Sequence, residues 1–218
     1  MLYEKIKNDT RVKSYIKGAD DALKALGYTE HSFAHSGIVA EVTGYILETL
    51  GFDEKSVDLG KTAGYLHDIG NIVNRVGHGH SSALMAFTLL NDLGAESDDI
   101  AVVVSAIGNH DEGTGVPISP IAAALILADK ADVRRNRIRN QENPGTDIHD
   151  RVNYSAKEAI LKINEAKTII KLKLTVDTRY GSVMDYFEIF LDRMLLCRKA
   201  AEKLGLQFKL IINEQQLI

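Results

Sequence analysis

A mainly α-helical fold with a small C-terminal β element, built as strand, helix and strand, is predicted by two features of the sequence. Most of the chain repeats apolar residues at three- and four-residue steps, as amphipathic helices do. The last third instead contains two short segments in which apolar and polar residues alternate. Hydrophobic residues make up 45% of the 218 residues, so we expect a sizeable core in a single domain over residues 1–218.

Helices are expected throughout the first two thirds of the chain. The apolar repeat that begins at His31 continues to Leu50, and Gly51 then supplies the residue type that commonly ends a helix. Ser119 and Pro120 form a typical helix start, with serine as N-cap and proline at the first helical position. The predicted helices begin near residues 31, 54, 80, 100 and 120, and the prolines at 117 and 144 mark loops.

The C-terminal third changes character. Residues 168–178 alternate as a half-buried strand does, residues 182–204 have a helical repeat, and residues 208–213 form a second candidate strand. We expect the two strands to pair into a small sheet packed on the helical body. The chain is thus expected to consist of a helical core of about residues 31–140 and an α+β extension of about residues 150–218.

Composition narrows the functional classes. The net charge is −4, which argues against general binding of nucleic acids or membrane surfaces. Cys197 is the only cysteine, so an intrachain disulfide and a cluster of thiolate metal ligands are excluded. No stretch is long and apolar enough to span a bilayer. We expect a cytoplasmic protein with neither a nucleic-acid nor a membrane partner.

Histidine and aspartate residues at helix-like positions form the strongest signal in the sequence. A His-Asp pair lies where an apolar helix ends, in the segment AGYLHDIGN, and further candidates fall three or four residues from apolar residues of their own helices. The candidate metal ligands are His35, His67, Asp68, His80, His110 and Asp129. Burying such groups unpaired would cost several kcal/mol each, a cost that a shared divalent cation removes.

Some of these assignments have competitors. His78 could replace His80, but Gly77 and Gly79 favour a flexible loop around it, so we favour His80, one helical turn before Leu84. Taken singly, any one of the histidines is more readily explained by a hydrogen-bonded core or boundary position than by a metal. His31 is either a further metal or substrate ligand or a helix-start residue near solvent. Asp111 is either a proton donor beside His110, or a residue that orients the His110 side chain, or a solvated loop residue.

The motifs HSGIVAEV, GYLHDIGN, GHSSALMA, GNHDEGTG and LILADKADVRR, in this order between about residues 31 and 139, resemble the HD superfamily of metal-dependent phosphohydrolases. The resemblance implies a helical bundle in which His35, His67, Asp68 and Asp129 hold a first metal. It is nearest to the two-metal branch, which implies that His80 and His110 hold a second ion with Asp68 as the bridge. The cyclic-dinucleotide enzymes of that branch have two adjacent histidines where this chain has Asn109 and His110, so their substrate is not carried over.

The resemblance implies hydrolysis of a phosphate mono- or diester, with a nucleotide as the expected substrate, by a water that the metal activates. Asp68 would hold the nucleophile, and Lys130 and Arg134 would contact phosphate oxygens. The expected cofactor is one or two divalent ions of iron, manganese, zinc, nickel, cobalt or magnesium.

Other functions stay open at this point. The chain could be a regulatory module that binds a nucleotide without turnover, or a metal-dependent oxygenase on the same scaffold. Comparing nucleotide binding with product release separates the first from an enzyme, and oxygen consumption reveals the second. The expected partner is a small-molecule phosphoester or nucleotide, and a homodimer is left open.

Overall fold

The computed structural model describes residues 1–139, 148–180 and 182–217. Within these residues, helices account for most of the first two thirds of the chain, as predicted, and no helix has both the length and the apolar character that a bilayer crossing needs. In chain order the helices are α1 (Leu2–Asn8), α2 (Thr10–Ala25), α3 (Phe33–Leu50), α4 (Glu54–Leu66), the short η1 (Ile69–Ile72), α5 (His78–Asp92), α6 (Ser97–Gly108), α7 (Pro120–Ala131), the short η2 (Arg135–Arg137), α8 (Ile148–Ser155) and α9 (Val183–Lys203). The loop expected around Pro144 lies outside the described residues.

α7 is the central helix of the bundle. It starts as predicted, with the Ser119 hydroxyl accepting a hydrogen bond from Ala122 N and Pro120 in the first turn. Every residue from Ile121 to Ala131 is buried, because α3, α4 and α6 pack around one side of α7 and α9 covers another. A helix that is apolar all round belongs in such a position. The polar pair Asp129 and Lys130 in its last turn is therefore the exception that needs a partner.

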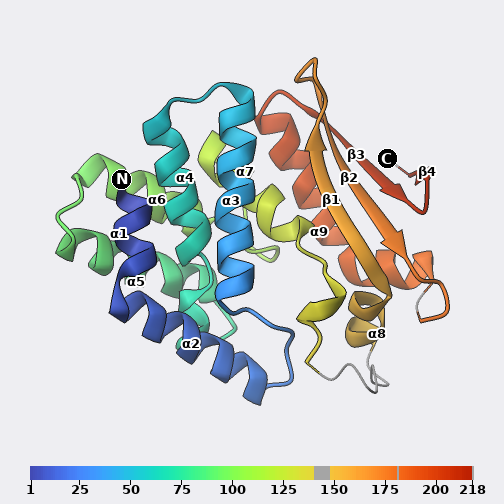
Figure 1. Ribbon diagram of the computed structural model, residues 1–218, viewed down its shortest axis with the longest axis horizontal. Coiled ribbons are helices and arrows are strands. Elements are labelled where there is room, and N and C mark those ends of the chain that lie inside the picture. The colour runs from blue at the N-terminus through green and yellow to red at the C-terminus, as the bar shows by residue number, and fades with distance from the viewer. Residues whose placement is uncertain (140–147, 181, 218) are drawn as a thin grey trace.

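The C-terminal part of the chain contains a four-stranded sheet. Its strands are β1 (Ala156–Ile163), β2 (Ile169–Val176), β3 (Gln207–Ile212) and β4 (Gln215–Gln216), in spatial order β1-β2-β3-β4. β1 and β2 form an antiparallel hairpin, whereas β2 and β3 are parallel and are connected through α9. Figure 1 shows the helical bundle on one side of the molecule and this sheet on the other.

The predicted strand-helix-strand unit is confirmed as β2, α9 and β3. β1 was not predicted, because its sequence AKEAILKI does not alternate strictly between apolar and polar residues. On β2 the alternation is clear, with Ile170, Leu172 and Leu174 fully buried and lysines between them. The sheet thus presents one apolar face to the core, and α9 packs against both β3 and α7. The division into a core of about residues 31–140 and an extension of about residues 150–218 stays a prediction.

The close contact of α3 with α4 yields a test of the packing. A Cβ atom on Gly64 would lie 2.7 Å from Ala40 Cα and 2.9 Å from Ala40 N, both backbone atoms that cannot move aside. We predict that Gly64→Ala lowers the free energy of unfolding by about 1–3 kcal/mol, the usual cost of overpacking. Chemical denaturation followed by circular dichroism measures the change.

Gly37 on the same α3 helix provides the control, because nothing lies within 4 Å of the Cβ that Gly37→Ala would add. Relative to glycine, alanine within a helix is favoured by roughly 0.5–1 kcal/mol, so this variant should be at least as stable as the wild type. Equal stability of the two variants would contradict the packing described for α3 and α4.

Candidate metal centre

Three helix ends bring His35, His67 and Asp129 together. His35 lies in the first turn of α3, His67 caps the end of α4, and Asp129 lies in the last turn of α7. His35 Nε2 is 3.2 Å from His67 Nε2 and 3.4 Å from Asp129 Oδ1, and His67 Nε2 is 3.7 Å from the same oxygen. Ligand atoms about 2.1 Å from one ion are separated by roughly 3.0–3.4 Å from their neighbours, so this spacing fits a single coordination sphere.

Asp68 lies between this group and a second one. Its Oδ2 is 3.3 Å from His67 Nε2 and 3.5 Å from His35 Nε2. Its Oδ1 is 3.3 Å from His78 Nε2 and 4.0 Å from His110 Nε2, and these two imidazole nitrogens are 3.2 Å apart. The two carboxylate oxygens of Asp68 therefore face two different pairs of imidazoles. This is the arrangement that a carboxylate bridging two ions requires.

The second nitrogen of each imidazole is occupied by an oxygen that can only accept a hydrogen bond. The Nδ1 atoms of His31, His67, His78 and His110 lie 2.6–3.1 Å from the carbonyl oxygens of Thr29, Gly64, Arg75 and Ile107, respectively. Each Nδ1 must donate, so that in the neutral ring Nε2 carries the lone pair that can bind a cation. Metal-binding histidines in proteins almost always have this second hydrogen bond.

Helix termini supply two of these acceptors. Gly64 and Ile107 lie three residues before His67 and His110, near the ends of α4 and α6, where carbonyl oxygens lack a helical partner. The imidazole N–H satisfies that oxygen, and the same hydrogen bond aims Nε2 inward. Local helix chemistry thus orients these two side chains before any ion is considered.

His35 has a carboxylate in place of a carbonyl. Its Nδ1 lies 2.7 Å from Asp132 Oδ2, and the guanidinium of Arg134 donates to the same carboxylate. Burial favours the neutral form of Asp132, but hydrogen bonds from His35 and Arg134 outweigh it and hold the pKa of this carboxyl below its usual range. Arg134 thus holds the group that orients His35, and its contact with a phosphate stays a prediction.

The electrostatics of the centre favour a cation between the two aspartates. Burial opposes the charge on Asp68 and Asp129. The neighbouring imidazoles nevertheless hold the pKa of the Asp68 carboxyl well below the usual range, and Lys130 with the imidazoles does so for Asp129. Burial lowers the pKa of His110 to about 3, which leaves this ring neutral. His67 is buried too, but Asp68 and Asp129 raise its pKa to about 10. Positive charge is thus drawn to the point where His67 meets both carboxylates.

The structure corrects the assignment of His80. α5 begins at His78, preceded by Gly77 in the left-handed conformation with φ 72°, so His78 is 2% exposed and faces Asp68. His80 is exposed, and so is Leu84, at 70%. The physical reason lies in η1, where a Cβ on Gly70 would be 2.3 Å from Ser82 N. That close backbone contact fixes the small residues in the first half of α5 inward and turns Leu84 and Phe87 to solvent.

Three predicted residues surround the ligand atoms. Lys130 Nζ is 2.6 Å from Asp129 Oδ2 and 3.4 Å from Glu112 Oε2, and the side chain is buried. His31 Nε2 is 4.0 Å from Asp68 Oδ2. Asp111 Oδ1 is 4.0 Å from His78 Nε2, and its side chain is 26% exposed.

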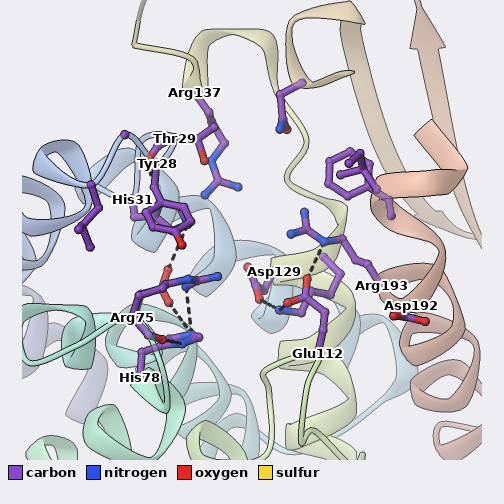
Figure 2. A pocket seen from close by; sticks show the side chains of 17 residues that line it. Tyr28, Thr29, His31, Arg75, His78, Glu112, Asp129, Arg137, Asp192 and Arg193 are labelled. Carbon is purple, nitrogen blue, oxygen red and sulfur yellow. Dashed lines mark hydrogen bonds and ion pairs between the residues drawn. The ribbon is translucent and has the colours of Figure 1, made fainter. Parts of the chain in front are cut away.

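A cavity of about 660 Å³ opens over Asp68 and Asp129. Figure 2 shows its walls: Tyr28, Arg75 and Arg137 lie on one side, and Arg193 reaches in from α9 on the other. Arg193 Nε lies 2.6 Å from Glu112 Oε1. Sequence reasoning missed Arg75 and Arg193, because no local spacing connects them with the histidine and aspartate motifs.

Comparison with known proteins agrees with this geometry. Residues 32–136 match the family model described as the HD domain, and this range contains all six residues whose ligand atoms converge: His35, His67, Asp68, His78, His110 and Asp129. Residues 32–136 of this chain form an HD domain. The helical bundle and the buried His/Asp groups that could hold a metal are thus those of an HD domain.

Several relatives match in sequence. An uncharacterized protein of Methanocaldococcus jannaschii is 28% identical over 162 residues, which cover 64% of this chain and 62% of that protein. Ribonuclease Y of Fervidobacterium nodosum is 33% identical over 115 residues, covering 53% of this chain and 20% of the enzyme. Ribonuclease Y of Enterococcus faecalis is 32% identical over 138 residues, which cover 56% of this chain and 25% of that enzyme. The similarity thus spans under two thirds of the archaeal protein and about a quarter or less of each ribonuclease.

The pair His78 and His80 gives a matched test of the second group of ligand atoms. We predict that His78→Ala loses one of two bound Mn²⁺ ions, because its Nε2 lies 3.3 Å from Asp68 Oδ1. His80→Ala should keep the wild-type metal content, since that side chain is exposed. Mass spectrometry of the metals after dialysis measures the stoichiometry. If His80→Ala lost metal while His78→Ala kept both ions, the assignment of His78 as a ligand would be wrong.

Proposed function

We propose that this protein is a metal-dependent phosphohydrolase with a dinuclear centre. The observation that carries the proposal is the position of Asp68, whose two oxygens face two separate pairs of imidazoles. His35, His67 and Asp129 would hold one ion with Asp68 Oδ2. His78 and His110 would hold the other with Asp68 Oδ1. Nitrogen and carboxylate donors in this proportion suit manganese, iron, zinc, cobalt or nickel better than magnesium.

When bound, two divalent ions would lower the pKa of a water molecule and offset the charge on phosphoryl oxygens. In hydrolysis the oxygen of that water forms the new bond to phosphorus, the ester P–O bond breaks, and a proton passes to the departing alkoxide. The chain holds the site ready for this reaction in two ways. Hydrogen bonds to Nδ1 fix the imidazoles, and burial keeps bulk water away from His35, His67 and Asp68.

Lys130 is a positioning residue in this proposal. Its ammonium group occupies Asp129 Oδ2, so that only Oδ1 faces His35 and His67. Burial opposes the charge of Lys130, but Asp129 and Glu112 outweigh it and raise the pKa of the ammonium group. The cation therefore stays charged and directs one oxygen of Asp129 toward the metal position.

The size of the cavity favours a small substrate. A volume of about 660 Å³ lies within the range of pockets that enclose ligands the size of a nucleotide, and α9 forms one of its walls. A phosphomonoester or a mononucleotide is therefore the preferred substrate class. An RNA phosphodiester is the second candidate, favoured by the relatives named ribonuclease Y.

Turnover by Mn²⁺-loaded protein on p-nitrophenyl phosphate, bis-p-nitrophenyl phosphate, nucleoside monophosphates and a short RNA tests the proposal. We expect hydrolysis of at least one monoester. Asp68→Asn should lower kcat/KM more than about 100-fold, which exceeds the 10–100-fold loss typical of residues that only hydrogen-bond to a metal ligand. Asp99→Asn is the control, because that carboxylate pairs with Lys55 at the surface.

Different outcomes separate the alternatives. Cleavage of RNA alone would replace the small-molecule assignment with the ribonuclease one. Nucleotide binding without release of any product from the metal-loaded wild type would contradict the enzyme and support a sensing module.

A further inference from the structure

Four basic side chains line the cavity above the candidate metal centre: Arg75, Lys130, Arg137 and Arg193. Two of them, both buried, bind other groups of the protein. Lys130 is bound to Asp129 and Glu112, and Arg137 donates to the carbonyl oxygens of Glu30 and Asp132. The other two guanidinium groups retain unengaged N–H donors.

Arg193 is held in place by two contacts that leave its terminal nitrogens unoccupied. Nε donates to Glu112 Oε1 at 2.6 Å, and the guanidinium lies 4.5 Å from the centroid of the Phe190 ring. Among the described residues, Nη1 and Nη2 of Arg193 have no hydrogen-bond or ion-pair partner, and Figure 2 shows the group directed from α9 into the cavity toward Asp129. Glu112 also faces Lys130, so one carboxylate is shared between two cations.

Arg75 reaches the cavity from the opposite wall. Its Nη1 lies 3.3 Å from Asn71 Oδ1 and 3.4 Å from His78 Nε2, and its guanidinium packs over the ring of Tyr28 at 5.6 Å. Asn71 in turn donates to Asp68 Oδ1 at 3.0 Å, so Arg75 is connected with the carboxylate at the middle of the centre. Across the described part of the chain, no partner of Arg75 Nε or Nη2 is found.

We propose that Arg193 and Arg75 form a clamp for the phosphoryl group of the substrate, and that α9 of the C-terminal extension thereby completes the substrate site. The inference rests on the proposed phosphohydrolase function. Each guanidinium offers planar paired donors that match two oxygens of a phosphate, and both border the space above Asp68 and Asp129. The ligand class is a phosphate dianion, free or as the monoester of a molecule up to mononucleotide size.

The clamp makes the extension part of the active site. α9 lies outside residues 32–136, which match the HD domain, so Arg193 is a contribution of this chain beyond the family segment. Substrate choice would then be set by two separate parts of the chain: the HD domain positions the reacting phosphorus, and α9 selects for a charged phosphoryl group.

Binding of inorganic phosphate to the Mn²⁺-loaded full chain, measured by isothermal titration calorimetry, tests this clamp without requiring turnover. We expect Arg193→Gln to weaken phosphate binding about 10- to 100-fold, the value of one or two charged hydrogen bonds. Arg75→Gln should have a similar effect. Arg198→Gln removes an equal charge from an exposed position of the same helix and should bind phosphate as the wild type does.

Metal content and melting temperature of each variant separate a binding role from a structural one. If Arg193→Gln does not fold, Arg193→Lys, which keeps the charge but loses the planar fork, should still weaken phosphate binding by more than about threefold. Wild-type phosphate affinity in a folded, metal-loaded Arg193 variant would overturn the clamp even if the enzyme hydrolyses esters. Phosphate binding that depends on Arg193 in a protein without turnover would support the clamp and contradict the proposed function.

Discussion

The structure depends on one buried carboxylate, Asp68, which five imidazoles surround. An ionised group away from water is costly unless opposite charge and hydrogen bonds replace its hydration. Here Asn71 donates one hydrogen bond to the side chain. Four of the five surrounding imidazoles donate from Nδ1 to carbonyl oxygens, so that their Nε2 atoms are directed toward the carboxylate. Positive charge among these groups, on a bound metal ion or on a protonated His67, offsets the charge of the carboxylate. That requirement explains why so many helices end at the same point.

Most of the candidate metal ligands lie at helix termini. His35 and His78 lie in first turns, His67 and His110 follow last turns, and Asp129 lies in a last turn. Ends of helices expose backbone groups that lack partners, and side chains near them are fixed by satisfying those groups. The bundle thus supplies both the convergence of the ligands and the hydrogen bonds that orient them. Close approaches at Gly64 and Gly70 bring the ends near enough to share an ion.

Sequence periodicity predicted much of this arrangement, and its failures have physical reasons. The helix starts at Ser119-Pro120, the strand-helix-strand unit and the convergence of His35, His67, His110 and Asp129 follow from local patterns. Periodicity predicts that α5 exists but not which face is buried. Leu84 and Phe87 look like core residues, whereas the inner face near the site is made of the small residues Gly79, Ser82 and Ala83. The close contact of Gly70 with the backbone of α5 places His78 rather than His80 in the site, and the apolar repeat of α5 does not reveal this contact. Arg193 was beyond prediction for a similar reason, since its place follows from how α9 packs on α7.

The central claim is that two cations bind on either side of Asp68, and anomalous diffraction from crystals grown with Mn²⁺ tests it most directly. The account predicts two anomalous peaks, one near His35, His67 and Asp129 and the other near His78 and His110, each about 2.0–2.2 Å from its ligand atoms. A map without peaks at these positions, with the imidazoles hydrogen-bonded to the carboxylates instead, would contradict it.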